Sequence, residues 1–547
     1  MVLSFVSAFL LIIIVGLPVA AIAAYAVFPH FNTLSFAEPF AKIWPSLNDP
    51  RLVGATLQAL ALSASVTLGT VLLATPFGYL RARITTIDGK IWDALFLIPF
   101  LIPPYVGSLA WMQVLQRNGF LEQLLGFNLE KFLFSFAGLT TVMTLHLFPL
   151  VYFSSSRAFA MIGSRYGDVA KVFGGRSLSI FARIELPLAL PAIFSSALIV
   201  FVLTIEEFGT PEILGRRFGF EVIVTAIHDK FTNWPIDLSG ASVLCLILIG
   251  VAFVAFQLHT RMAARFNISV ETSAQPMSSG QASNGHRLIV WATFASLAIV
   301  SVMGPVASIT ISAFMITISG GVTWENMGFR NFAEIFSTGS DAFQAIGTSL
   351  TLAALAAILT GLMALIIAFS VVRLQSRGTA FLDFLSILPN AIPGMAVAVG
   401  LILTWNLPFW PVTPYNTVGI LLMAYLCLML PYPIRMVTVA LRQLPTSLDD
   451  AAYISGANEW IVIKNILAPI LLPVSLAAGF IVFAVSTREL VSSLMLAPPG
   501  VETVATFVFR QFDQGSINVA MAMSLLVVLV SGSIIALGQK MQGSHKP

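Results

Sequence analysis

Twelve long apolar stretches run through the chain, and no other feature limits its fold so strongly. Each is close to the roughly 20 residues that a helix needs to cross a bilayer core of about 30 Å. Their approximate bounds are 4–28, 55–80, 94–114, 138–157, 189–206, 239–260, 288–315, 347–371, 384–404, 417–434, 471–487 and 518–538. In addition, 57% of the residues are apolar and only 10% are charged, where about a quarter is usual in soluble domains. The sequence therefore predicts an all-α integral membrane protein and excludes a water-soluble one.

Two of these spans contain proline clusters, and we expect them to be kinked or broken. One cluster is Pro99, Pro103 and Pro104, and the other is Pro389 and Pro393. A proline inside a helix removes a backbone hydrogen bond and clashes with the preceding turn. The first stretch has no basic n-region and is too long for a typical signal-peptide core, so it is predicted to be a retained helix.

Positive charges are divided unevenly between the loops. With an even number of spans both termini lie on one side, and the loops of that side hold 18 of the 28 Lys and Arg residues. The positive-inside rule then predicts that both termini are cytoplasmic. Acidic residues lean the other way, with 9 inside and 16 outside, so the net charge of +3 conceals +9 inside and −6 outside. We expect a multi-pass protein of the cell (inner) membrane, with too little net charge for a nucleic-acid surface.

The two halves of the chain repeat one another. At a shift of 282 residues, positions 149–207 match positions 431–489 at 13 of 59 places. A Ser/Gly/Asn/Gln-rich segment, residues 266–286, lies almost at the midpoint and is predicted to be a flexible linker. We expect a first module over 1–265 and a second over 287–547, each with about six spans. Because six is an even number, the two six-helix repeats run parallel, related by an axis along the membrane normal.

The longest inside loop of each half carries the same pattern. It covers 166–187 in the first half and 448–469 in the second. Each loop has an acidic residue suited to a helix N-terminus, a glycine six positions later, a short amphipathic stretch and a proline pair. This order predicts a helix, a turn that glycine permits, and a second helix that enters the membrane with prolines near its start.

These loops resemble the coupling loop of permease subunits of ATP-binding-cassette (ABC) importers of the type I architecture. The family signature is E-A-A, three residues, Gly, nine residues and Ile-x-Leu-Pro; here Asp replaces the leading Glu, Val169 the middle Ala and Ala468 the Leu, with the spacing intact. The matching residues are Asp168, Ala170, Gly174, Ile184, Leu186 and Pro187 in the first half and Asp450, Ala451, Ala452, Gly456, Ile466 and Pro469 in the second. The resemblance implies two fused permease modules of the type I ABC importer fold, each with a coupling helix that docks on an ATPase.

The resemblance also implies the partners. The chain has no G-x-x-x-x-G-K-[ST] motif, so it lacks that means of cradling ATP phosphates. In the family, ATP and Mg are bound by a separate dimer of ABC ATPase subunits, and an extracytoplasmic solute-binding protein delivers the solute. We therefore expect a transport permease in the lipid bilayer that has no catalytic residues and binds no cofactor itself.

Charged residues follow the span after each coupling loop. Glu207 and Glu489 are repeat equivalents, and Glu206 has Arg488 as its equivalent. Sixteen residues separate Pro191 from Glu207, which is roughly 24 Å of helix and places these charges near the outer boundary. Ionisable residues at such a depth mark transport pathways or form ion pairs, and the residues alone favour neither. Our hypothesis is that Glu206, Glu207 and Glu489 line the outer gate and that Arg488 balances them.

The same segments resemble the ferric-iron branch of the permease family. The branch carries an E-E-F-G-x-P stretch, here 206–211, and an E-L-x-x-x-L-x-L-x-P-P-G stretch, here 489–500. Ferric iron is therefore the expected cargo, and relatives for thiamine, phosphonates, polyamines or sugar phosphates share the architecture. The acidic residues suit a cationic cargo, but they could equally dock the binding protein.

Two other classes of protein fit less well. A secondary transporter driven by an ion gradient needs ionisable residues in the middle of several spans, and a membrane-embedded enzyme needs clustered His, Asp or Glu; the spans are nearly free of both. No metal site is predicted, because His146 has no carboxylate or Tyr at ligand spacing and is interpreted as a packing residue. Cys245 and Cys427 lie in apolar runs and are interpreted as buried small residues.

Overall fold

A computed structural model describes residues 2–83, 89–162, 169–170, 172–269, 284–374, 378–408 and 410–543. Within these ranges the regular elements are helices, apart from one isolated bridge between Met315 and Met327. Nine helices of the described chain are long and apolar enough to cross a membrane, and three further pairs of helices pass the same test when each bent pair is taken as one span. The prediction of an all-α membrane fold with about twelve spans is confirmed when each bent pair is counted as one span.

The first half supplies six of these spans in order. They are α1 (Val2–Leu11) with η1 (Ile12–Gly16) and α2 (Leu17–Val27); α4 (Pro50–Arg83); α5 (Gly89–Leu101) with α6 (Pro104–Leu115); α9 (Phe136–Ile162); α11 (Ser177–Ile180) with η3 (Phe181–Glu185) and α12 (Leu186–Ile205); and α14 (Leu238–Ser269). Shorter helices in the connections are η2 (Phe31–Thr33), α3 (Ile43–Asn48), α7 (Phe120–Leu125), α8 (Glu130–Leu133), η4 (Pro211–Gly215), η5 (Arg216–Phe218) and α13 (Ile223–Thr232).

The second half repeats this order. Its spans are α15 (Asn284–Ala298) with η6 (Ile299–Met303) and α16 (Gly304–Phe314); α18 (Asp341–Val372); α19 (Thr379–Ile387) and η8 (Leu388–Ala391) with α20 (Gly394–Trp405); α21 (Val418–Met429) with α22 (Pro431–Gln443); α24 (Glu459–Val462) with η9 (Ile463–Leu467) and α25 (Ala468–Ser486); and α28 (Ile517–Gly543). The shorter helices are η7 (Trp324–Asn326), α17 (Arg330–Ile335), α23 (Ser447–Ile454), α26 (Val491–Leu496) and α27 (Val504–Asp513).

The third span of each half is broken where the sequence predicts it. Pro103 directly precedes α6 and Pro393 directly precedes α20. Both have an extended backbone, with φ −55 and ψ 139 for Pro103 and φ −57 and ψ 145 for Pro393. The helices on the two sides of each break are bent by 97° in the first half and by 115° in the second. Because proline has no N–H and fixes φ, it ends one helix and starts the next in a new direction.

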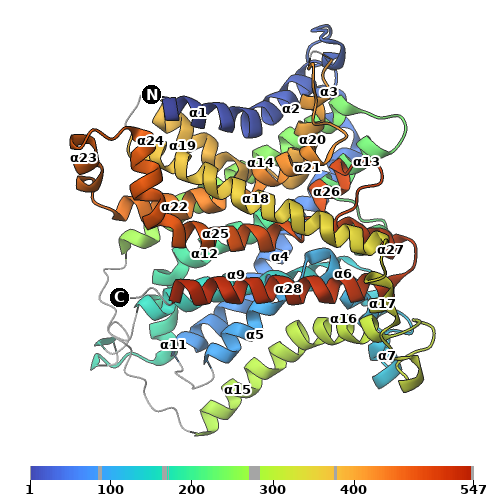
Figure 1. The fold of residues 1–547 in the computed structure, drawn as a ribbon. Helices are drawn as coiled ribbons and strands as arrows, with labels where there is room; N and C mark the ends of the chain where they lie inside the picture. Colours follow the sequence, from blue (N-terminus) through green and yellow to red (C-terminus); the bar gives the residue numbers. More distant parts are fainter. Residues whose placement is uncertain are drawn as a thin grey trace.

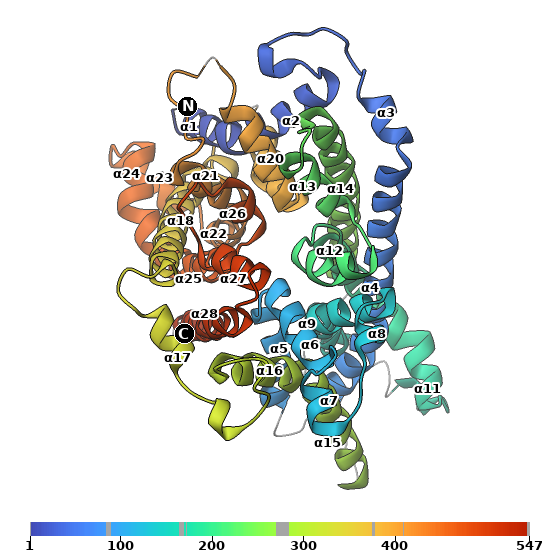
Figure 2. The ribbon, with the colours of Figure 1, turned by 90° about the vertical axis from the view of Figure 1, so that its right-hand side faces the viewer.

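The halves exchange their first helices in part, because α2 packs on α14 of its own half as well as on the other half, and α16 likewise packs on α28 of its own half. In Figures 1 and 2, α1 and α2 of the first half lie beside α18, α20 and α21 of the second, and α16 of the second half lies beside α6 of the first. The approach is close at Gly400 of α20, where an added Cβ would lie 2.7 Å from the carbonyl oxygen of Pro18. Glycine permits such backbone contact between membrane helices. Each half therefore completes the other, and the six spans of a half do not form a separate bundle.

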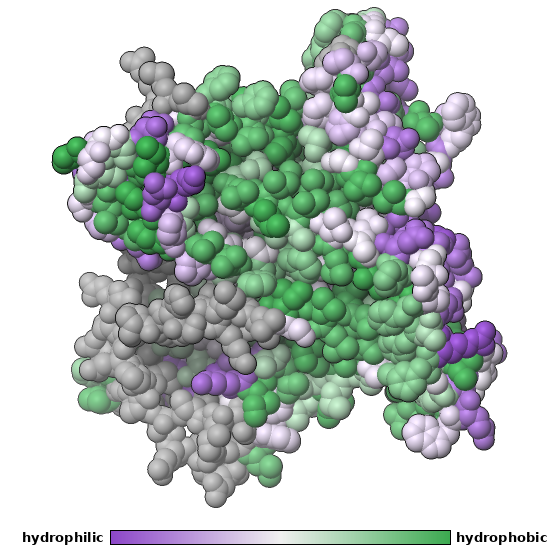
Figure 3. Space-filling view, in the orientation of Figure 1, coloured by the Kyte–Doolittle hydropathy of each residue, from purple (hydrophilic) through white to green (hydrophobic). Residues whose placement is uncertain are grey.

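The spans define two polar faces with an apolar belt between them. We call one the coupling-loop face; it carries α11, α23 and α24, the start of α1 and the end of α28 (Figure 1). We call the opposite one the distal face; it carries α3, α7, α13, α17 and α27. Apolar side chains cover most of the surface between the two (Figure 3). Exposed leucines such as Leu68, Leu72 and Leu362 belong to this belt, as expected of a surface that faces lipid.

The predicted linker is shorter than the sequence indicates. Helix α14 continues to Ser269 and α15 begins at Asn284, so both ends of the predicted segment 266–286 are helical. Residues 270–283 lie outside the described part of the chain. The Ser/Gly-rich composition alone could not locate these ends, because membrane helices often extend beyond the apolar core into polar sequence.

Candidate functional site: a cavity between the two halves

A cavity of about 1130 Å³ lies between the halves. Its lining comes from α5, α6, α9, α12 and α14 of the first half and from α20, α22, α25 and neighbouring turns of the second. On the coupling-loop side it reaches His259 and Ala263, in the second half of α14, and Arg442, near the end of α22. On the distal side it reaches the turns that follow α12 and α25.

The structure brings all four predicted gate residues into this cavity. Glu206, Glu207, Arg488 and Glu489 line it together, although slightly more than half of the sequence separates the two pairs. Glu206 and Glu207 come directly after α12, and Arg488 and Glu489 follow α25 at the equivalent position. The repeat in the sequence is thus a repeat in space, and two parallel modules deliver equivalent residues to one central site.

Glu207 and Glu489 also shape the chain around them in the same way. Glu207 Oε1 accepts a hydrogen bond from the Thr210 N–H at 3.2 Å, and Glu489 Oε1 accepts one from the Ser492 N–H at 3.0 Å. In each half the carboxylate caps the turn that leads to the next short helix, as an N-cap residue does. Glu489 Oε1 also accepts the Ser492 hydroxyl at 3.1 Å. Each glutamate therefore has a structural role at the cavity wall.

Arg488 does not pair with these carboxylates, as our hypothesis had it. No ion pair within 4 Å joins it to an acidic residue in the described part of the chain, and its Nη1 donates instead to the carbonyl oxygen of Phe100 at 2.7 Å. Its guanidinium also lies over the Phe100 ring, 5.4 Å from the centroid. The reason is the broken span: in a continuous helix this carbonyl would bond the N–H of residue 104, which is a proline without one. Arg488 reaches across from the second half and satisfies it.

The turn after α12 packs tightly on α6. An added Cβ at Gly209 would lie 2.6 Å from the Cβ of Tyr105, a cavity-lining residue of α6. One position further, the Thr210 hydroxyl lies 2.8 Å from the Ser108 hydroxyl of α6. In the second half, the Tyr425 hydroxyl of α21 lies 2.8 Å from the hydroxyl of Ser493. The turns that carry the glutamates are therefore fixed to the helices around the cavity.

On the distal side of the glutamates, apolar and aromatic side chains close the space between the halves. Phe208 is fully buried, and its ring lies 6.2 Å from that of Phe509 on α27 of the other half and 5.1 Å from that of His228 on α13. Toward the coupling-loop face the aromatic contacts between the halves lie outside the cavity lining, at α5 and α15, where the rings of Phe96 and Phe294 are 5.6 Å apart. In this conformation the cavity is therefore closed on the distal side and extends toward the coupling-loop face.

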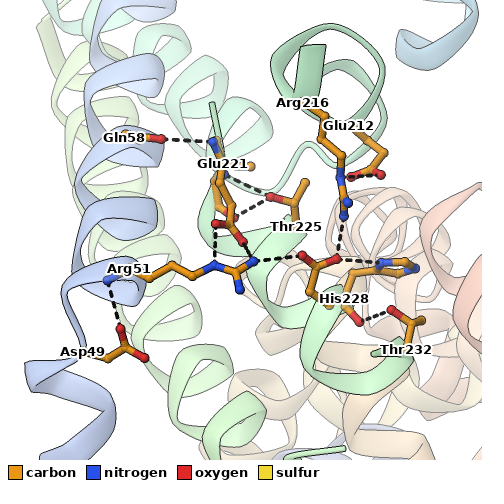
Figure 4. Close-up of polar contacts among 11 residues, drawn as sticks. Asp49, Arg51, Gln58, Glu212, Arg216, Glu221, Thr225, His228 and Thr232 are labelled. Atoms are coloured by element: carbon orange, nitrogen blue, oxygen red, sulfur yellow. Dashed lines mark hydrogen bonds and ion pairs between the residues drawn. The ribbon is translucent and has the colours of Figure 1, made fainter. Parts of the chain in front are cut away.

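Ionic networks tie the distal helix α13 to the start of α4 (Figure 4). Arg51 of α4 donates from Nε and Nη2 to both carboxylate oxygens of Glu221, at 2.9 and 2.7 Å, and its Nη2 lies 3.1 Å from Asp229 Oδ2. Asp229 also pairs with Arg216, which lies 2.7 Å from Glu212. Burial raises the pKa of Glu212 and lowers the pKa of His228.

The second half has an equivalent network with two charges reversed. Arg510 of α27 lies 3.0 Å from Asp341, the first residue of α18, and 2.7 Å from Glu502. In the repeat, Asp341 takes the place of Arg51, and Arg510 takes the place of Asp229. In each half an arginine therefore joins the distal helix to the start of the long helix, from α4 in the first half and from α27 in the second; its bidentate partner is Glu221 or Glu502, just before the distal helix.

The coupling loops have the predicted backbone design. In the second half α23 contains Asp450, Ala451 and Ala452, and two residues after its end lies Gly456, with φ +83. The Ala457 N–H donates to the Ala452 carbonyl and the Gly456 N–H to the Tyr453 carbonyl, both at 3.0 Å, which is the Schellman C-cap pattern. Ile466 lies in η9, and Pro469 lies in the first turn of α25.

The first half has the same turn. Gly174 has φ +80, and the Gly175 N–H donates to the Ala170 carbonyl at 2.8 Å. Ile184 lies in η3 and Pro187 in the first turn of α12, so both π-helical segments, η3 and η9, fall at the same point of the repeat. The predicted Asp168 lies outside the described residues. Only glycine readily adopts the positive φ at these two caps, which explains the glycine of the motif.

Each coupling loop is also anchored by an arginine that the motif does not include. Arg373, just after α18, lies 2.7 Å from Asp449 of α23 and donates to the Leu444 carbonyl at 2.9 Å. Its repeat equivalent Arg83, at the end of α4, pairs with Glu185 at the end of η3. Burial raises the pKa of Asp449, and Arg373 opposes this effect. The four side chains were missed because the acidic partners occupy different positions in the two copies and leave no repeated signal.

His146 was interpreted as a packing residue, but it lies in the cavity wall, close to Gly107 of α6. Tyr105 and Tyr432 line the cavity as well. In the described residues, no three His, Cys, Asp or Glu side chains are grouped closely enough to hold a metal ion. Cys245 and Cys427 are buried, as predicted.

Known proteins resemble this chain over most of its length. Residues 361–544 match the family model of the binding-protein-dependent transport system inner membrane component. An Fe(3+)-transport system permease protein of Haemophilus influenzae is 25% identical over 533 residues, which is 97% of each chain. A ferric transport system permease protein of Actinobacillus pleuropneumoniae is 27% identical over 492 residues, covering 87% of this chain and 69% of its own. A molybdenum transport system permease protein of Mycobacterium tuberculosis is 27% identical over 247 residues, covering 44% of this chain and 89% of its own.

Proposed function

We propose that the chain is a permease of a binding-protein-dependent ABC importer and that it forms the transmembrane pathway for ferric iron, because residues 361–544 match the family model and two ferric permeases resemble most of the chain. In this proposal an extracytoplasmic binding protein delivers the iron at the distal face. An ABC ATPase dimer, which holds ATP and Mg, docks on the coupling loops at the cytoplasmic face. Both termini are then cytoplasmic, in agreement with the excess of positive charge in the loops of that side.

The cavity carries the proposal for a cationic cargo. Three carboxylates, Glu206, Glu207 and Glu489, meet at its wall, with the hydroxyls of Tyr105 and Tyr432 also in the lining. Oxygen donors suit hard, highly charged cations. Arg435, Arg442 and Arg488 line the cavity as well. The three carboxylates lie at its distal end, where Arg488 offsets only one of their charges, so a cation is favoured there over a molybdate or phosphonate anion. A pathway must also release its cargo, so a loose arrangement of charges serves transport better than a tight ligand cage.

The conformation supports alternating access. The cavity extends toward the coupling-loop face, and the Phe208–Phe509 contact closes the distal side. We assign this arrangement to the inward-facing state. Closure of the ATPase dimer would bring the two coupling loops together and rock the halves about the cavity, opening the distal side.

Uptake of radioactive ferric iron by proteoliposomes tests this proposal, with the permease, its ATPase and an iron-loaded binding protein present. Glu207→Gln and Glu489→Gln keep an oxygen that accepts the capping N–H but remove one charge each. We expect each to lower the initial uptake rate at least about tenfold, because a unit charge a few ångströms from a cation contributes several kcal/mol at low dielectric. Glu325→Gln, on the exposed distal helix η7, is the matched control and should transport normally.

Two results would contradict the proposal in different ways. If both glutamine variants took up iron at the wild-type rate, the carboxylates would have no part in the pathway. If the wild-type protein accumulated molybdate or a phosphonate but not ferric iron, the cargo assignment would be wrong, while the assignment as a permease would stand.

A further inference from the structure

The connection between α2 and α4 exposes a group of large apolar side chains on the distal side of the molecule. They lie within residues 34–47 and are Leu34, Phe36, Phe40, Trp44 and Leu47, with exposed fractions between 43% and 73%. We call residues 34–47 the edge segment. Single exposed apolar side chains are common on protein surfaces, but five within 14 residues indicate a surface that meets a partner.

The edge segment lies at the side of the molecule and not over the centre of the distal face. Figure 2 looks onto this face and shows α3, which begins within the edge segment, at the rim beside the start of α4 and outside α14. Helix α3 contacts both of these helices. The residues that line the cavity between the halves include none from the edge segment. Its exposed side chains therefore face the surroundings of the protein and not the pathway.

The same apolar surface continues along the outward side of α4. The exposed large apolar side chains of this helix are Val53, Leu57, Leu68 and Leu72, and their spacing puts them on one face. This face is part of the apolar belt described above. Val53 and Leu72 are 19 residues apart, which is about 29 Å of helix and matches a bilayer core of about 30 Å. The belt therefore begins near Val53, and the edge segment lies just beyond it, at the depth of the lipid headgroups.

Aromatic packing and a backbone hydrogen bond give the edge segment a defined shape. The Phe31 ring packs edge to face against Tyr25 of α2, with centroids 5.5 Å apart, and against Phe36, with centroids 5.8 Å apart. The Phe40 N–H donates to the Val27 carbonyl at 2.7 Å. The exposed rings are therefore carried by an ordered backbone.

Three residues of the edge segment have an unusual backbone conformation. Leu34, Glu38 and Phe40 have φ of 56, 52 and 65, and none of them is glycine. Positive φ is unfavourable for residues with a side chain. Such residues persist where the surrounding structure imposes a particular shape. Here that shape leaves the rings of Phe36 and Phe40 exposed.

The composition of the edge segment suits lipid better than a protein partner. Its only charged residues are Glu38 and Lys42, so it has no net charge with which to attract a charged protein surface. Aromatic rings such as those of Phe40 and Trp44 are favoured where the hydrocarbon meets the headgroups. Lys42 lies between them in the sequence and is exposed, and the long lysine side chain suits a lipid phosphate.

We propose that the edge segment is an interfacial membrane anchor. Phe36, Phe40, Trp44 and Leu47 enter the boundary between the acyl chains and the headgroups, and Lys42 stays among the headgroup phosphates. The segment joins α2, which packs on α20 of the other half, to α4 of its own half, so the anchor fixes the depth of both helices in the bilayer. On the proposed orientation this is the outer leaflet; only the choice of leaflet rests on the proposed function.

Spin labels in the full-length protein measure the depth of the edge segment. The buried Cys245 and Cys427 are first replaced by alanine, and one cysteine is then introduced by Phe40→Cys or by Trp44→Cys. The labelled proteins are placed in nanodiscs of phosphatidylethanolamine and phosphatidylglycerol, without iron, ATPase or binding protein. Oxygen concentrates in lipid, whereas a nickel chelate stays in water. At both positions the ratio of oxygen collisions to chelate collisions should be several-fold higher than at an aqueous position.

Two control positions calibrate this ratio. Leu57→Cys, on the outward face of α4, should give the high ratio of a residue in the apolar belt. Glu325→Cys, on the exposed distal helix η7, should give the low ratio of an aqueous residue. Labels at 40 and 44 should lie between Leu57 and Glu325 and closer to Leu57.

A second measurement compares the Tm in detergent with the Tm in the same nanodiscs. The double substitution Phe40→Ser with Trp44→Ser should reduce the gain in Tm on transfer to lipid, whereas Trp44→Tyr should retain it, because tyrosine is also favoured at the interface. Trp234→Ser is the matched control. Trp234 is 89% exposed on the turn that contains the Lys230–Asp237 ion pair, and its loss should leave the gain unchanged.

Three results would overturn the anchor. The first is that the labels at 40 and 44 give the aqueous ratio of Glu325→Cys. The second is that Trp234→Ser reduces the gain in Tm as much as the double substitution. The third is that the two labels become inaccessible to both reagents only when the binding protein is added, because the partner would then be a protein. Neither measurement involves transport, so a failure of the proposed function would leave these results unchanged.

Discussion

At the scale of single residues, Arg488 satisfies a backbone carbonyl 388 residues away, that of Phe100, which Pro104 leaves without its helical partner. The carbonyl of Phe100 has lost its helical partner, and Arg488 supplies a hydrogen bond of 2.7 Å from the other half. Arg488→Met should leave this carbonyl without a donor and lower the stability by about 1–3 kcal/mol. Arg488→Lys should restore part of the loss. The measurement is the Tm of the purified protein.

The control for this prediction is Arg442→Met. Arg442 lines the same cavity but is exposed and has no hydrogen bond or ion pair in the described chain, so its loss should hardly change the Tm. Equal destabilisation by both variants would mean that Arg488 acts through general electrostatics and not through the Phe100 carbonyl.

Gly209 is the residue where the smallest change should have a large effect. A Cβ at this position would meet the Tyr105 Cβ at 2.6 Å, and the neighbouring hydrogen bond between Thr210 and Ser108 leaves little room for movement. Gly209→Ala should therefore cost about 1–3 kcal/mol, as overpacking does, and should reduce transport by displacing Glu207. The comparison is Gly361→Ala in the membrane helix α18, where no atom lies within 4 Å of the added Cβ; this substitution should be neutral or slightly stabilising. Similar Tm values for the two variants would contradict this account.

At the scale of helices, the anchor between α18 and α23 makes one coupling loop a rigid attachment. Asp449 is buried against Arg373, whereas the next residue, Asp450, is exposed in the first turn of α23. We expect Asp449→Asn to lower the Tm and to weaken the stimulation of ATPase activity by the loaded binding protein several-fold. This follows because removing one partner of a buried pair is costly, whereas an exposed carboxylate contributes little to stability.

Asp450→Asn is the matched comparison for Asp449→Asn. It changes the same chemical group one residue away, and its Tm should stay close to that of the wild type. If Asp450→Asn were the more destabilising of the two, the anchor would not be the feature that holds α23.

The helix α13 should make the protein sensitive to acid. Burial lowers the pKa of His228, the nearby Arg216 lowers it further, and Asp229 opposes both. Between pH 7 and 5 the unfolded chain therefore takes up a proton that the folded protein refuses, and the stability falls as the pH falls. His228→Gln has no proton to take up, so its Tm should decline less steeply over this range. His30→Gln, an exposed histidine of the same face, should follow the wild-type curve; a His228→Gln curve parallel to wild type would refute the assignment.

At the scale of the whole molecule, the sequence predicts the membrane spans and the repeat, but not the contacts between the two halves. Hydropathy locates the twelve spans, and the repeat predicts that Glu207 and Glu489 are equivalent, because both signals are local or evenly spaced. The exchange of first helices is not predictable in this way, since an apolar helix such as α2 carries no mark of which half it packs against. The partner of Arg488 and the walls of the cavity between the halves depend on that packing, so neither could be foreseen from residue spacing.

The exchange itself predicts how a divided chain would behave. If residues 1–269 and 284–547 are produced together as separate polypeptides, they should co-purify, because α2 packs on α20 and α16 packs on α6. Removal of residues 2–27 from the first piece should greatly reduce recovery of the complex, since the Pro18–Gly400 contact and its surroundings are lost. The yield of the second piece retained by an affinity tag on the first measures this. Full recovery without α1 and α2 would show that the exchanged helices are dispensable for assembly.

The covalent union of two exchanged halves has a consequence for how their residues can change. In an assembly of two identical subunits, every substitution appears twice and each position near the axis faces a copy of itself. Here the two halves are different sequences, so a substitution changes only one side of the interface. A different substitution in the other half can compensate for it. The unlike pairs Glu206 and Arg488, and Arg51 and Asp341, are what such freedom permits. The side chains that line such a pathway can therefore differ between the two halves, while the helices that carry them keep an approximate two-fold symmetry.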